Sequence, residues 1–176
     1  MRVVNGLSVL RDRSKQTRAR IVNVVDPLTD EQLAWRPNPR AHSIGFTLWH
    51  TARADDNVQL DLTGAPLEWE RGEWARRWGH PERGVGTGWD DERAAALPLP
   101  PRAELLDYVR RVFGSVDTAL DAIEDARLDT ALKSRFMGGD STVGEVIGAC
   151  VTHDNRHLGE IEYIKGLLGL RGTATI

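Results

Sequence analysis

The sequence has a single cysteine and no long apolar run, and each shortage excludes a class of protein. Cys150 cannot form a disulfide within the chain, which favours a cytoplasmic protein over a secreted one. No apolar stretch approaches the roughly 20 residues that span a bilayer. The arginine-rich N-terminus lacks the continuous apolar core of a signal peptide. We therefore expect a cytoplasmic protein with no membrane partner.

An excess of charge of one sign is also missing. The chain has 23 basic and 26 acidic residues, for a formal net charge of −3. Proteins that bind nucleic acid usually present a strongly basic surface, so we expect no nucleic-acid partner. With 176 residues, 40% of them hydrophobic, the chain can bury a core of its own, and we expect one domain over residues 1–176.

Four long segments have the periodicity of amphipathic helices, and no segment predicts a convincing strand. Capping residues, glycines and prolines mark the helix ends. The expected helices run from about Gly6 to Val25, from the N-cap Ser43 to Thr63, from Pro101 to about Glu124, and from the N-cap Thr142 to about Leu168. Such a set is typical of an all-α four-helix bundle.

The segment between the second and third helices, about residues 65–100, is irregular. It contains several glycines, many charges and four of the six tryptophans: Trp69, Trp74, Trp78 and Trp89. A segment of this length inside a compact domain is usually a functional loop or an insertion with short helices of its own. We expect the tryptophans to pin the insertion onto the bundle or to fill a subunit interface, with an apolar substrate mouth as the alternative.

Ionisable residues interrupt the core-facing stripe of the fourth helix. Asp154 and His157 lie on that stripe, and His153 lies at its edge, one turn before His157. Burying such groups is costly unless they are paired or bound to a metal. Because residues four apart in a helix lie on adjacent turns, both imidazoles can reach one ion.

A third ligand has to come from another helix, and His50 in the second helix is the best candidate. It lies about a third of a turn from the main stripe of that helix, between Phe46 and Ala54. This position suits a helix that contacts two neighbours on different sides. Spacing alone leaves a hydrogen-bonded histidine cluster as an equal alternative to a metal site.

The sequence around these histidines resembles that of the DinB-like superfamily. His50 lies in TLWHTA at residues 47–52, and the pair lies in HDNRHLGEI at residues 153–161. The likeness extends to the helix order and to the GLLG ending at residues 166–169, and it covers most of the chain outside the insertion. The resemblance implies a bundle whose second and third helices are joined by a crossing connection. It also implies a homodimer and one divalent ion, zinc or nickel, held by His50, His153 and His157.

Three neutral imidazoles leave a coordination position for water or a substrate atom, as in catalytic sites. The resemblance implies an enzyme that uses a low-molecular-weight thiol, because relatives use bacillithiol or mycothiol as S-transferases or as a thiol-dependent maleylpyruvate isomerase. The partners would then be a small thiol and an electrophile. A non-catalytic, stress-related protein that binds a metal or small molecule and a metal-dependent hydrolase are the alternatives.

Other residues near the histidines have supporting roles in this interpretation. We expect Asp154 and Asp55 to orient metal-binding groups rather than to bind the ion, although a hydrolase could use either as its base. We expect Cys150 to be a small buried side chain rather than a thiolate. No role is assigned to three further residues: His42, His80 and Arg156.

Overall fold

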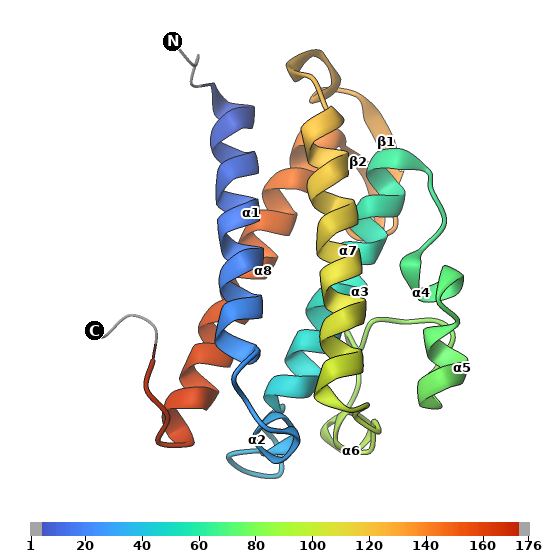
Figure 1. Ribbon diagram of the computed structural model, residues 1–176. Coiled ribbons are helices and arrows are strands. Elements are labelled where there is room, and N and C mark those ends of the chain that lie inside the picture. Colours follow the sequence, from blue (N-terminus) through green and yellow to red (C-terminus); the bar gives the residue numbers. More distant parts are fainter. Residues whose placement is uncertain (1–4, 173–176) are drawn as a thin grey trace.

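Four long helices form a bundle in the computed structural model, which describes residues 5–172 (Figure 1). They are α1 (Gly6–Val25), α3 (Ile44–Thr63), α7 (Arg102–Ala122) and α8 (Val143–Leu167). Helices α1 and α3 each pack against both α7 and α8. In Figure 1, α1 and α8 run downwards whereas α3 and α7 run upwards, so the neighbours α3 and α7 are parallel. Parallel neighbours need a long crossing connection, and the expected crossover bundle is therefore confirmed.

The ends of the bundle helices follow from local sequence signals. Ser43 and Thr142 cap α3 and α8 as predicted, because each side-chain oxygen accepts a backbone N–H of the first turn. Gly64 and Gly169 have positive φ just beyond the same two helices, the conformation in which glycine commonly ends a helix. Helix α7 ends at Ala122, slightly before the expected end.

Short elements fill the connections. They are α2 (Asp30–Ala34) after α1, then α4 (Glu68–Arg71), α5 (Trp74–Trp78) and α6 (Asp91–Ala95) in the insertion, and the 3-10 turn η1 (Asp125–Arg127) after α7. Among residues 5–172, no helix combines the length and hydrophobicity that a membrane span requires.

A small antiparallel hairpin precedes α8 and consists of β1 (Ala131–Ser134) and β2 (Gly139–Thr142). We expected no strand in the chain, and this expectation is wrong here. The strands are four residues each and mostly exposed, so they lack the apolar alternation by which a half-buried strand is recognised.

Asp61 near the end of α3 holds the hairpin turn against the bundle. Its carboxylate accepts hydrogen bonds from the Ser134 hydroxyl at 2.6 Å and from the backbone N–H groups of Arg135 and Phe136 at 2.8 and 3.0 Å. Charge-assisted bonds of this kind are stronger than neutral ones. The position of the turn relative to α3 is therefore well defined.

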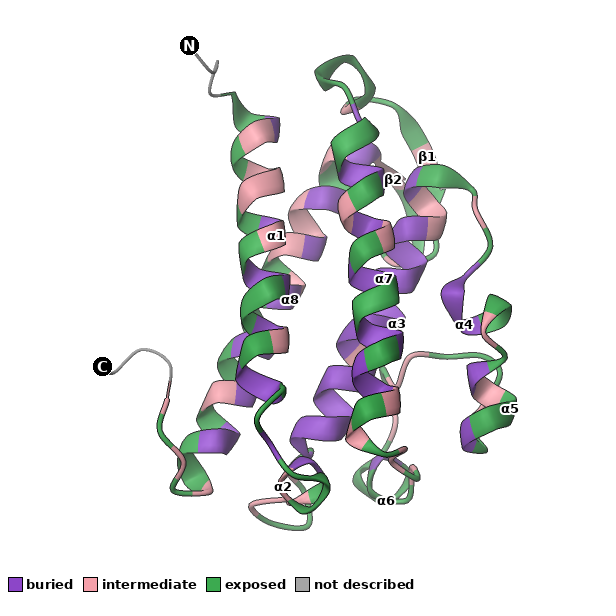
Figure 2. Ribbon diagram, viewed as in Figure 1, coloured by how far each residue is buried: buried purple, intermediate pink, exposed green. Residues whose placement is uncertain are grey.

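Helix α3 is the most enclosed element of the bundle. Figure 2 shows it buried around most of its surface, whereas the outward faces of α1 and α7 are exposed. Helices α2 and α4 also contact α3, in addition to α7 and α8. Polar side chains on α3, such as Asp55 and Asp56, therefore lie inside the protein and need partners.

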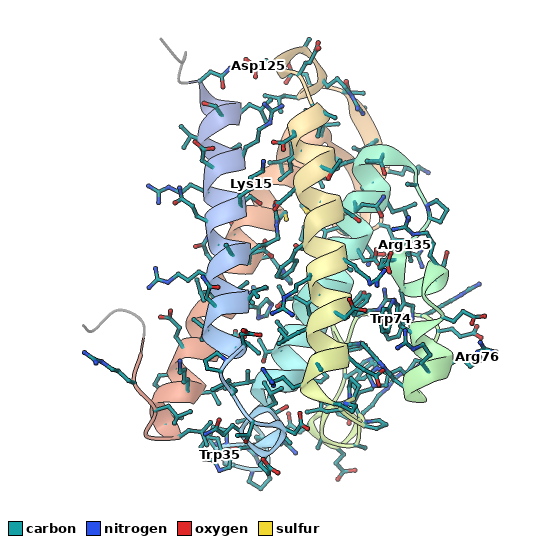
Figure 3. All side chains as sticks on the ribbon, in the orientation of Figure 1. Lys15, Trp35, Trp74, Arg76, Asp125 and Arg135 are labelled. Atoms are coloured by element: carbon teal, nitrogen blue, oxygen red, sulfur yellow. The ribbon has the colours of Figure 1, made fainter. Side chains whose placement is uncertain are left out.

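The tryptophans of the insertion pin it onto the bundle, which was one of the predicted alternatives. Trp69, Trp74 and Trp78 are buried, and their ring centres lie 5.4, 5.5 and 5.7 Å from that of Tyr108 on α7. Figure 3 shows Trp74 between α5 and α7. Contacts of this kind bury large apolar areas, so the insertion is packed onto the bundle rather than loosely attached.

Replacing Asp56 by alanine is expected to destabilise the protein by about 2–3 kcal/mol. Its buried carboxylate accepts the backbone N–H groups of Glu68 and Trp69 at 2.8 and 2.9 Å, and these donors would lose their acceptor. Urea unfolding followed by tryptophan fluorescence measures the change. Asp140→Ala, at an exposed strand position, is the control, and an equal loss in both variants would contradict this role for Asp56.

Candidate metal centre

The three histidines predicted as ligands meet between α3 and α8. Nε2 of His153 lies 3.2 Å from Nε2 of His50 and 3.1 Å from Nε2 of His157. A tetrahedral ion with nitrogen ligands at about 2.0–2.1 Å holds neighbouring nitrogens roughly 3.3 Å apart. These two spacings are therefore close to those of a tetrahedral metal site, and all three ring nitrogens lie within 4.8 Å of one another.

Hydrogen bonds at the far ring nitrogens orient two of these histidines. Nδ1 of His50 lies 2.6 Å from the carbonyl oxygen of Val85, and Nδ1 of His157 lies 2.6 Å from a carboxylate oxygen of Glu160. Because these oxygens accept hydrogen bonds, both Nδ1 atoms carry the proton. The Nε2 lone pairs of both rings then face the centre, as in most metal-ligating histidines.

Hydrogen bonds between the rings do not account for the cluster. A proton on Nε2 of His153 could be donated to His50 or to His157, and one pair of nitrogens would still meet without a proton between them. Burial, together with the neighbouring His157, lowers the pKa of His50 and of His153 to about 4. Both rings are therefore uncharged at neutral pH, and neutral imidazole nitrogens of this kind suit a divalent cation.

Behind His153, two fully buried aspartates share a guanidinium from α1. Nη1 of Arg18 lies 3.3 Å from Asp154 and 3.5 Å from Asp55. Burial raises the pKa of Asp154 to about 6 in spite of Arg18. Burial and the neighbouring Asp154 raise the pKa of Asp55 well above its usual range. The pair therefore carries less than its full double negative charge. Arg18 faces it and also pairs with Asp117 on α7 at 2.5 Å.

This arrangement argues against two of the roles considered for Asp55 and Asp154, namely a hydrogen bond to a metal-binding histidine and a general base. Asp154 lies 3.6 Å from Nδ1 of His153, which is longer than a hydrogen bond. Asp55 accepts a contact from the thiol of Cys150 at 3.5 Å. Both carboxyls are sealed inside the bundle, so neither is placed to act as a base on a substrate. Asp55, Asp154 and His153 could also form a second cation site by proximity, but Arg18 already supplies the positive charge there.

Cys150 is a buried side chain, as expected. It is 1% exposed, and burial with the adjacent carboxyls raises the pKa of its thiol well above the usual value. A thiol that stays protonated is a poor ligand and a poor nucleophile. The sulfur therefore contributes to packing and to the contacts of Asp55.

Three groups that shape the site were not predicted from the sequence. Glu160 follows His157 by three residues, a helical spacing that brings side chains together and was a usable signal. Arg18 interrupts the buried face of α1, which was a second usable signal. Val85 contributes its backbone carbonyl oxygen. Every residue has such a group, so the residue type at this position does not predict the role.

A glycine-rich loop in the insertion delivers the Val85 carbonyl to the site. Gly84, Gly86 and Gly88 all have positive φ, a conformation that glycine adopts without strain. A Cβ atom on Gly86 would lie 3.0 Å from the rings of both Phe46 and Trp49. Glycine at this position therefore allows the loop to lie directly against α3.

Gly86→Ala is expected to weaken metal binding by about 10- to 100-fold, the usual cost of disturbing a group that orients a ligating histidine. The added methyl group would push the loop, and with it the Val85 carbonyl, away from His50. Competition with a chromophoric chelator measures the affinity. Gly88→Ala has the same sign of φ but no atom near the added methyl group, and comparable weakening there would argue against a role for loop position.

Two cavities open onto the histidines and share His50, Thr87 and Arg156 in their walls. The larger, about 470 Å³, reaches His153. The smaller, about 310 Å³, reaches His157. Cavities of this size admit small molecules. The coordination position that the three histidines leave open is therefore accessible from both sides.

Known proteins share this fold and this histidine-bearing region of sequence. A family model described as the DinB superfamily matches residues 13–161. No curated protein matches the sequence. A conserved protein from Enterococcus faecalis superposes with a TM-score of 0.80 at 18% identity, over 95% of this chain and 99% of its own.

Two further solved structures are similar. YfiT from Bacillus subtilis, described as a probable metal-dependent hydrolase with an unusual four-helix bundle topology, has a TM-score of 0.62 at 15% identity, over 97% of this chain and 93% of its own. A DinB-like protein from Bacillus cereus has a TM-score of 0.63 at 20% identity, over 91% of each chain. At such identities the likeness is one of fold.

Proposed function

This chain belongs to the DinB superfamily, and on that premise we propose that it is a metal-dependent enzyme that joins a low-molecular-weight thiol to a small electrophile. His50, His153 and His157 would hold one divalent ion, zinc or nickel. The observation that carries the proposal is the convergence of three Nε2 atoms at the meeting point of two cavities. When bound, the ion supplies positive charge that favours the thiolate form of a coordinated thiol.

The residues around the ion would orient its ligands. The Val85 carbonyl and the Glu160 carboxylate keep protons of His50 and His157 on Nδ1. The enclosure of His50 and His153 lowers the pKa of both rings, so protons compete weakly for their nitrogens. A preformed set of oriented ligands helps a catalytic site to retain its metal.

The surroundings favour thiol chemistry over hydrolysis. Many metal-dependent hydrolases use a carboxylate as general base beside the attacking water, and within residues 5–172 the larger cavity has no carboxylate in its walls. Asp55 and Asp154, the bases considered for a hydrolase, are sealed behind His153. A thiol needs no such base, because its proton is lost readily when the sulfur meets a cation.

A metal-dependent hydrolase is the second candidate, and Glu160 is the observation in its favour. Glu160 lines the smaller cavity beside His157, and its side chain is 46% exposed. Its hydrogen bond with His157 lowers its pKa, which makes it a weak base. YfiT, which has the same fold, is described as a probable metal-dependent hydrolase.

Assays on zinc- and nickel-loaded protein separate these candidates. We expect bacillithiol, mycothiol or cysteine to be conjugated to 1-chloro-2,4-dinitrobenzene, with the activity lost in His157→Ala. Hydrolysis of p-nitrophenyl esters without a thiol, abolished by Glu160→Gln, would favour the hydrolase. One bound metal per chain with neither activity would indicate a binding protein and overturn the proposed reaction.

A further inference from the structure

The larger cavity is positively charged although the protein as a whole is acidic. Arg135, in the hairpin turn, and Arg156, on α8, both line it, and within residues 5–172 no aspartate or glutamate does. The formal net charge of the whole chain is −3. Two guanidinium groups in a recess walled by protein create a locally positive field that attracts anions.

The backbone positions of both arginines are fixed, one by hydrogen bonds to α3 and the other by its place within α8. The N–H of Arg135 donates to Asp61 at 2.8 Å, so the turn that carries it is tied to α3. Figure 3 shows Arg135 beside the upper part of α3. Arg156 follows His153 by three residues on α8, and its charge acts on His153 and Glu160. One arginine therefore lies beside the histidines and the other lies across the cavity from them.

Neither side chain forms a close ion pair with a carboxylate in the part of the chain that the structure describes, in contrast to Arg18. A charge of opposite sign that acts on Arg156 is that of Glu160, four residues further along α8. Guanidinium groups pair with carboxylates through two parallel hydrogen bonds. Both groups are therefore available to a bound anion.

The rest of the lining suits a small polar molecule. Asn57, Thr87 and Thr152 offer amide and hydroxyl groups, and Phe136 and Met137 offer apolar surface. At about 470 Å³, the cavity falls within the usual range for small-molecule sites. These features match an organic anion better than an inorganic ion, which would leave most of the space unfilled.

The smaller cavity differs in charge and in lining. It shares Arg156 with the larger one but also contains the carboxylate of Glu160, which offsets that positive charge, and Phe46 and Trp89 line it. The aromatic rings suit an apolar or aromatic molecule. The larger cavity, with two arginines and no carboxylate in its described walls, is therefore the better site for an anionic reactant, and the smaller one suits the electrophile.

We infer that the larger cavity binds the carboxylate of an anionic substrate through Arg135 and Arg156, and that in the proposed reaction this substrate is a carboxylate-bearing thiol. The inference rests on the proposed function and adds the charge class of the thiol. His50 and His153 line the same cavity as the two arginines, so the carboxylate and the sulfur of one bound molecule can face the two groups of residues.

The test compares two thiols on cobalt-loaded protein, in which a bound sulfur produces a charge-transfer absorption band. We expect mercaptosuccinate to bind about 10- to 100-fold more tightly than uncharged 2-mercaptoethanol, since hydrogen bonds between charged groups have about that effect. Arg135→Gln and Arg156→Gln should each reduce this ratio of affinities. Arg13→Gln, at an exposed position on α1, is the matched control.

The outcomes separate the two proposals. Equal binding of both thiols would overturn the inference and leave the thiol function standing. If neither thiol alters the spectrum, calorimetry with succinate decides: binding that both arginine variants weaken would support the anionic cavity and reject the thiol function. Absence of succinate binding in that case would overturn both.

Discussion

Alanine in place of His50, His153 or His157 is expected to lower the affinity for zinc by at least about a hundredfold. Changing a group that merely orients a metal-bound histidine costs about 10- to 100-fold, and loss of a ligand should reach or exceed the upper end. Elemental analysis after dialysis, with chelator competition for the affinity, measures the effect.

His42→Ala is the matched control for these three variants. His42 lies in the wall of the smaller cavity, and its ring is tilted against that of Phe46, with 4.4 Å between the ring centres, so it takes no part in the cluster of Nε2 atoms. This variant should keep one metal ion per chain. Full metal retention in His153→Ala, whose Nε2 contacts both other histidines, would contradict the site.

Methionine in place of Arg18 is expected to destabilise the protein by about 3–5 kcal/mol near neutral pH, the usual cost of removing one partner from a buried ion pair. Arg18 is 1% exposed and lies within 3.5 Å of both Asp55 and Asp154. Methionine fills similar space with a flexible apolar chain, so the loss of stability is caused by the missing charge and not by an empty cavity. Urea unfolding measures the change in the free energy of unfolding.

The cost of Arg18→Met should shrink as the pH falls. Burial raises the folded-state pKa of Asp154 from 3.8 to about 6, so its protonation favours folding. Its stabilising contribution is complete below about pH 4 and is lost as the pH rises through 6. Without Arg18 the folded pKa rises further, and the unpaired carboxyl costs more at pH 8 than at pH 5. Asp154→Asn in the Arg18→Met background should recover part of the loss, and a cost independent of pH would contradict this account.

The helix ends could be predicted from the sequence because the signals act over a few residues. The hydroxyls of Ser43 and Thr142 bond to the turn that directly follows them, and Gly64 ends α3 through its own backbone conformation. The hairpin was missed because Asp61, its main anchor, is more than seventy residues away in the chain.

The candidate site was predictable to different degrees for different residues. His153 and His157 share a helical spacing. His50 was the best third candidate from its position in the second helix, and the family resemblance strengthened that choice. Arg18 is a charged residue on an otherwise apolar helix face, but its partners lie on three other helices. The Val85 carbonyl depends on the path of the glycine-rich loop, which no residue type specifies. The homodimer and the cytoplasmic location stay predictions.

The distance along the chain between His50 and His153, 103 residues, has a consequence for how the protein matures. An ion held by both would act as a removable crosslink between α3 and α8, and closing so long a loop takes more entropy from the unfolded chain than closing a short one. Chelation should therefore loosen the whole bundle. During synthesis, a nascent chain can complete the ligand set only once α8 has emerged from the ribosome, so metal acquisition would come last.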